Sequence, residues 1–139
     1  MQVLPVGEAP ADAFAAAAAR WRDFDYFFIH VKGTDMAGED GDFGAKVEAI
    51  ETVDRALPSL LALAPDVLCI TGDHSTPVPA RSHSWHQVPA LVSAPLCGAD
   101  GAPRFHERAA RSGSLGLLES RDLIAVLLAN AGRLDKYGA

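Results

Sequence analysis

The sequence predicts an α/β fold, with a mostly parallel sheet flanked by helices. Three continuous apolar runs indicate strands covered on both faces, at residues 26–31, 67–70 and 88–93. Helix-forming segments alternate with these runs, at residues 12–24, at residues 43–63 and from Ser120 onward. The order helix, strand, helix, strand, strand, helix is typical of α/β proteins.

Each expected helix has its own signal. Residues 12–24 contain the alanine run 15–19 and a basic end. Residues 43–63 place apolar side chains three and four positions apart, although Pro58 should kink or restart the helix. The last helix can be capped by Ser120. Its expected buried face consists of Leu123, Ile124, Leu127 and Leu128.

Length and composition restrict the class of protein. The 139 residues suit a single domain, and 49% hydrophobic with 22% charged residues is an ordinary globular composition. The net charge of −6 argues against nucleic acid as a partner. No apolar run is long enough to span a membrane, and no signal peptide is expected. Two cysteines, one of them (Cys69) expected to be buried, give no disulfide framework, so we expect a cytoplasmic protein.

Side chains of the metal-ligand type gather in the two loops that follow the first two expected strands. Residues 32–42 are expected to form a loop, and they contain three glycines and four acidic residues. Residues 72–77 include Asp73 and His74, with His83 and His86 further along. Ligands of α/β proteins bind where strands end, so these carboxylates and imidazoles could surround one or two divalent cations.

Simpler interpretations compete with the metal site. Asp and Gly commonly form turns, Asp73 could cap a helix, and His74 could be a solvated loop residue. His86 is expected at the surface or packed on Trp85, and His30 in the core. Other chemistries lack their motifs, because the sequence has no phosphate-binding glycine loop, no paired CxxC cysteines and no serine in a G-x-S-x-G setting.

Two blocks of sequence resemble the archaeal-type cofactor-independent phosphoglycerate mutases of the alkaline phosphatase superfamily. The first block runs from Phe28 to Asp42, with Lys46 and residues 50–55. The second is Thr71-Gly72-Asp73-His74-Ser75-Thr76-Pro77, followed by Ser82-His83-Ser84 and Val88-Pro89. The carboxyl-terminal stretches 112–116, 121–123 and 136–139 are also similar to the family's.

The resemblance implies a site for two divalent metals, most often Mn²⁺, with Mg²⁺ and Zn²⁺ as alternatives. Asp73 and His74 match the ligands of one metal, and Asp35 and His83 match those of the other. Glu39 occupies the position of a further family ligand, which is a histidine. Lys32 is a candidate for neutralising substrate phosphate, although a solvated loop lysine is the simpler interpretation.

The resemblance also implies an activity, the interconversion of 2- and 3-phosphoglycerate in glycolysis, which is an isomerase reaction. Family members are much longer, with a phosphorylatable serine near the amino terminus and an inserted domain that holds the substrate. We therefore expect residues 1–139 to be the carboxyl-terminal, metal-binding portion, inactive alone because no catalytic nucleophile is recognised. Its expected partners are phosphoglycerate when the other half is supplied, a separate amino-terminal chain, or a second copy. Two alternatives are a non-catalytic binding or assembly module and hydrolysis of another phosphate ester.

Overall fold

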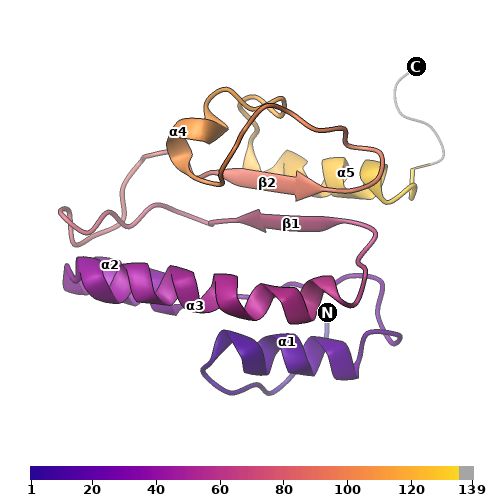
Figure 1. Cartoon of the computed structure of the whole chain (residues 1–139), viewed down its shortest axis with the longest axis horizontal. Helices are drawn as coiled ribbons and strands as arrows, with labels where there is room; N and C mark the ends of the chain where they lie inside the picture. Colours follow the sequence, from indigo (N-terminus) through magenta and orange to yellow (C-terminus); the bar gives the residue numbers. More distant parts are fainter. Residues whose placement is uncertain (135–139) are drawn as a thin grey trace. The chain divides into compact units, whose positions relative to one another are not determined.

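The computed structural model describes residues 1–134 (Figure 1). They divide into two compact units, of which the first comprises residues 1–65 with 76–84, and the second residues 66–75 with 85 onward. No described helix is long and apolar enough to cross a membrane. The single domain expected over 1–139 stays a prediction, and the family-like ending at 136–139 lies outside the described residues.

The first unit is built from three helices, α1 (Pro10–Ala19), α2 (Gly33–Asp40) and α3 (Phe43–Leu61). The longest, α3, contacts both of the others. Helix α1 confirms the alanine-rich prediction, beginning at Pro10, where a missing N–H costs nothing, and ending before Arg20. The buried side chains that join these helices are Phe14, Ala17, Ala37 and Leu60.

Helix α3 confirms the helix predicted for residues 43–63 and ends at Leu61, but Leu60 is the only residue of its apolar face that is buried. Asp42 precedes it, and the Asp42 carboxylate accepts a hydrogen bond of 2.9 Å from the Ala45 N–H. Pro58 does not restart the helix, because α3 continues through it for one last turn and loses only the hydrogen bond that the Pro58 nitrogen cannot donate. The Pro58 carbonyl still accepts the N–H of Ala62.

The loop expected over residues 32–42 is wrong, since most of it is helix α2. Its glycines suggested a turn, but one of them, Gly38, is buried in the helix together with Ala37. Gly41 then ends the helix in the left-handed conformation (φ 72°), which glycine adopts without strain. Small side chains that pack against neighbouring segments thus outweigh the poor helix propensity of this sequence.

The strand expected over residues 26–31 is also wrong, because the structure places no strand there. Phe27 instead stacks on Trp21 with ring centroids 5.1 Å apart, and Phe24 meets Phe27 edge-on. The alternate aromatic side chains, Tyr26 and Phe28, are exposed. His30 is exposed as well, so its expected place in the core is wrong.

The second unit contains strands β1 (Leu68–Thr71) and β2 (Ala90–Ser93), followed by α4 (Glu107–Ala110) and α5 (Ser120–Asn130). These strands confirm two of the expected apolar runs, and they pair with Leu68 opposite Ser93 and Thr71 opposite Ala90. The pair is antiparallel, contrary to the mostly parallel sheet expected (Figure 1). The expected parallel pairing joined residues 26–31 to 67–70 through a helix, and it is absent from residues 1–134 because the first of these strands does not form.

No described side chain of the second unit is fully buried. Helix α5 begins at Ser120 as expected, but Glu119 is its N-cap residue, and the expected buried face leaves Ile124 and Leu128 exposed. Cys69 is half-buried rather than buried, and its partial burial raises the pKa of the thiol.

Candidate metal centre

Helix α2 presents two carboxylates on one face. Asp35 and Glu39 are four residues apart, which is the spacing of neighbours along one side of a helix. The Asp35 side chain is 11% exposed and that of Glu39 is 49% exposed. The helix that the sequence did not predict is therefore what aligns these two expected ligands.

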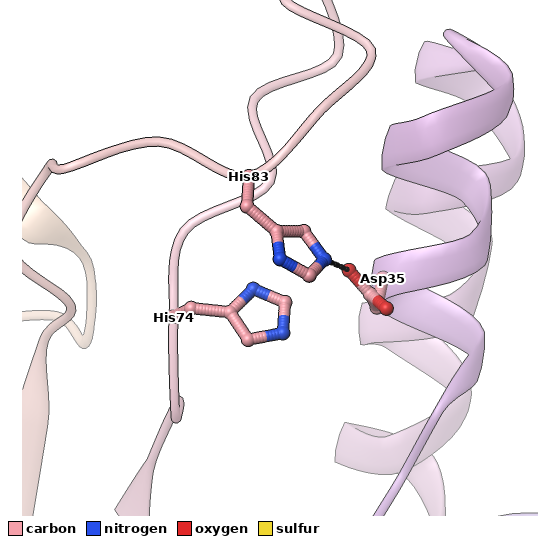
Figure 2. Close-up of side chains that lie close together, drawn as sticks. All are labelled: Asp35, His74 and His83. Carbon is pink, nitrogen blue, oxygen red and sulfur yellow. Dashed lines mark ion pairs between the residues drawn. The ribbon is translucent and has the colours of Figure 1, made fainter.

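His83 adds a nitrogen to the two carboxylates. Its Nε2 lies 3.6 Å from Asp35 Oδ1 and 3.5 Å from Glu39 Oε1, and Figure 2 shows its ring directed at the Asp35 carboxylate. The structure thus brings together the three residues that the family resemblance assigned to one metal. The position at which the family's histidine is replaced, Glu39, faces the same nitrogen as Asp35 does.

Two side chains hold the Asp35 carboxylate. The Thr76 hydroxyl donates a hydrogen bond of 2.6 Å to Oδ1, and the Lys32 ammonium donates one of 2.5 Å to Oδ2. Lys32, the expected phosphate contact, is therefore paired with a carboxylate in this structure. An ammonium at this distance offsets part of the repulsion between the carboxylates of Asp35 and Glu39.

Sequence reasoning missed Thr76 and Lys46 as contributors to this cluster. Lys46, on α3, donates a hydrogen bond of 2.6 Å from Nζ to the backbone carbonyl of Thr76. The available signal was the position of Thr76 inside the same conspicuous block as Asp73 and His74. Nothing local to the block shows that its threonine meets a helix some forty residues earlier.

Each of the two carboxylates lies from His83 Nε2 at about the distance expected between two ligands of one cation. A metal bound by nitrogen and oxygen at ~2.1 Å separates adjacent ligands by roughly 3.0–3.4 Å, close to the 3.5 and 3.6 Å observed around His83 Nε2. Two carboxylates with one imidazole form a predominantly oxygen set, which Mn²⁺ and Mg²⁺ accept more readily than Zn²⁺ does.

The other two expected ligands, Asp73 and His74, belong to the second unit. Asp73 Oδ1 accepts the backbone N–H of His74 at 3.1 Å, and the His74 Nε2 lies 3.6 Å from Asp73 Oδ2. No described helix begins at Asp73, so the interpretation of this residue as a helix cap is wrong.

The remaining histidines have local roles. His86 stacks on exposed Trp85, with ring centroids 5.0 Å apart, as expected for a surface or packing residue. His106 caps α4 by accepting the Ala109 N–H at Nδ1, a role that its sequence context did not indicate.

Comparisons with known proteins show the family to which this chain belongs. The Metalloenzyme superfamily matches residues 8–130. The chain is 54% identical to a protein of Thermus thermophilus and 48% identical to one of Deinococcus radiodurans. Both are named "probable 2,3-bisphosphoglycerate-independent phosphoglycerate mutase", and the chain matches them over its whole length but spans only 35% of theirs.

A solved structure has the same fold as this chain. The chain superimposes on the PH0037 protein of Pyrococcus horikoshii with a TM-score of 0.92 and 32% identity. The match covers 99% of this chain and 45% of that one. Residues 8–130 account for most of the sequence, and the chain therefore belongs to the Metalloenzyme superfamily, with 2,3-bisphosphoglycerate-independent phosphoglycerate mutases among its relatives.

Proposed function

We propose that this chain is the metal-binding portion of a 2,3-bisphosphoglycerate-independent phosphoglycerate mutase, which interconverts 2- and 3-phosphoglycerate. The observation that carries the proposal is the convergence of Asp35, Glu39 and His83 in a chain of this superfamily. The relatives named as mutases support the reaction.

In this proposal Asp35, Glu39 and His83 hold one divalent ion, and Asp73 and His74 contribute to a second. The chain itself limits how far His74 can lie from the first set. Only Ser75 separates His74 from Thr76, so their Cα atoms are at most about 7 Å apart, and the Thr76 hydroxyl is bonded to Asp35. We propose Mn²⁺ as the ion, because the first set has more oxygen than nitrogen donors.

A divalent ion bound here would supply positive charge to phosphate oxygens and would lower the pKa of an attacking hydroxyl. The side chains of the chain then have distinct tasks. Asp35, Glu39 and His83 orient and partly neutralise the ion. The Lys32 ammonium can leave Asp35 and pair with a substrate phosphate instead. That exchange needs only a rotation of the lysine side chain, more than half of which is exposed.

Calorimetric titration of the purified chain with Mn²⁺ tests the metal site. The unaltered chain should bind Mn²⁺, and Asp35→Asn and His83→Ala should each weaken binding by at least the ~10–100-fold that loss of an outer partner costs. Asp54→Asn, an exposed substitution on α3, is the matched control and should bind normally. Absence of Mn²⁺ binding by the unaltered chain would contradict the proposal and favour the non-catalytic module.

The proposed division of labour also predicts that this chain alone lacks mutase activity. The resemblance places the family's phosphorylatable serine near the amino terminus of the long relatives, of whose length this chain spans 35%. Without that hydroxyl the phosphoenzyme cannot form. Incubation with Mn²⁺ and 3-phosphoglycerate should give no 2-phosphoglycerate above background, whereas clear turnover would show that this chain contains its own nucleophile.

A further inference from the structure

The Thr76 side chain is placed to control the direction of the Asp35 carboxylate. Among the described residues Thr76 is the only polar one that is buried, with 4% of its surface exposed. Its hydroxyl has a single proton, which it donates to Asp35 Oδ1 at 2.6 Å. The same oxygen lies 3.6 Å from His83 Nε2. A carboxylate oxygen accepts more than one partner, so the bond from Thr76 leaves Oδ1 able to bind a cation on the side of His83.

Thr76 is itself held from a second helix. Lys46, on α3, donates a charge-assisted hydrogen bond of 2.6 Å to the Thr76 carbonyl. The hydroxyl of Thr76 is therefore directed at α2 while its backbone is fastened to α3. Two bonds from different helices restrict both the position and the rotation of one residue.

Gly38 makes this close approach possible. A Cβ atom at position 38 would lie 2.4 Å from the Thr76 carbonyl oxygen and 3.0 Å from Lys46 Nζ. Contact that short between a Cβ and a backbone oxygen forces one segment to move. A side chain at 38 would thus separate the segment containing Thr76 from α2, and with it the hydroxyl from Asp35.

We infer that Thr76, which Lys46 holds close to Gly38, is a positioning residue that orients the Asp35 carboxylate toward the metal. The inference rests on the proposed metal site but assigns a role to residues that are not themselves expected ligands. Hydrogen bonds commonly orient the histidines that bind metals, and here a hydrogen bond would orient a carboxylate in the same way.

The test compares Thr76→Val with Thr76→Ser in the full chain. Valine has the shape of threonine without its hydroxyl, and it should weaken Mn²⁺ binding by roughly 10–100-fold. Serine keeps the hydroxyl and should restore the affinity, although it lacks the methyl group. If loss of the hydroxyl instead lowered only the melting temperature of the metal-free chain and left Mn²⁺ affinity unchanged, Thr76 would be purely structural and the inference would be overturned.

A second measurement does not depend on metal binding. In crystal structures of the metal-free chain, the Asp35 carboxylate should have one orientation in the unaltered protein and a different or mixed orientation in Thr76→Val. An identical carboxylate orientation in both would overturn the positioning role. If the unaltered chain binds no Mn²⁺, the proposed function fails, but these two structures still decide what Thr76 does.

Discussion

Glu39 stands at the position where the family resemblance leads us to expect a histidine. Its Oε1 faces His83 Nε2 at 3.5 Å, as Asp35 Oδ1 does from the preceding turn of α2. Exchanging an imidazole for a carboxylate at this position adds negative charge and removes a nitrogen donor. The cluster should consequently prefer hard cations over Zn²⁺.

The substitution Glu39→His should reverse that preference. It would give a donor set of two imidazoles and one carboxylate, which is typical of zinc sites. We expect Zn²⁺ binding to strengthen by about 1–2 kcal/mol, corresponding to roughly 5–30-fold, as measured by calorimetry against Mn²⁺ on the same protein.

Glu51→His is the matched control for this experiment, because it places a histidine at an exposed position of α3. Zn²⁺ affinity in the control should stay at the level of the unaltered chain. Equal Zn²⁺ affinity for Glu39→His and the unaltered chain would mean that position 39 does not contribute a metal donor.

At the scale of the elements, the short junction between α2 and α3 connects the two carboxylates on α2 to the start of α3. Gly41 ends one helix and Asp42 caps the next, so the two helices are joined through only two residues. Helix α3 also contributes Lys46, which holds Thr76. The first turn of α3 is therefore linked to the cluster by covalent connection and by hydrogen bonding.

Asp42→Ala should destabilise the first unit by about 1 kcal/mol, the usual cost of removing an N-cap side chain. The physical reason is that the Ala45 N–H, now bonded to the Asp42 carboxylate at 2.9 Å, loses its partner. Urea unfolding followed by circular dichroism measures the change as a lower midpoint. Asp54→Ala, inside the same helix, should not lower the midpoint, and equal effects of the two substitutions would contradict the capping role.

At the scale of the whole molecule, the first unit exposes an apolar stripe on α3. It consists of Phe43, Val47 and Ile50, which are 73%, 37% and 53% exposed. Their spacing of four and three residues places them along one side of the helix. Contiguous exposed apolar surface of this kind commonly marks an interaction site.

We predict that the isolated chain self-associates through this stripe, since in a solution of the chain alone the only partner available to it is a second copy. Sedimentation velocity should show an average mass that rises with concentration, and Ile50→Glu should reduce that rise. Glu51→Gln, on the neighbouring side of α3, should leave the association unchanged. A monomer at every concentration would show that the stripe is not a self-association site.

Several elements could be predicted from the sequence because their signals are local. The apolar spacing of residues 43–63, the alanine run of α1 and the short apolar runs of β1 and β2 each show their periodicity within one segment. The identities of the metal-type residues are local as well, because Asp35, His74 and His83 stand in short blocks that resemble a known family. Local features of this kind can be recognised without knowledge of the tertiary contacts.

Other features were decided by contacts between segments distant in sequence. Residues 33–40 are helical although their glycines predicted a loop, because small side chains pack closely there and Gly38 lies under the Thr76 carbonyl. Residues 26–31 form no strand although most of them are apolar, because Phe27 packs on Trp21 while Tyr26 and Phe28 are exposed. The sequence by itself determined which residues are candidates for binding a metal. Only the tertiary structure decided that Thr76 and Lys46 hold Asp35 in place, because a hydrogen bond between residues 35 and 76 leaves no trace in the periodicity of either segment.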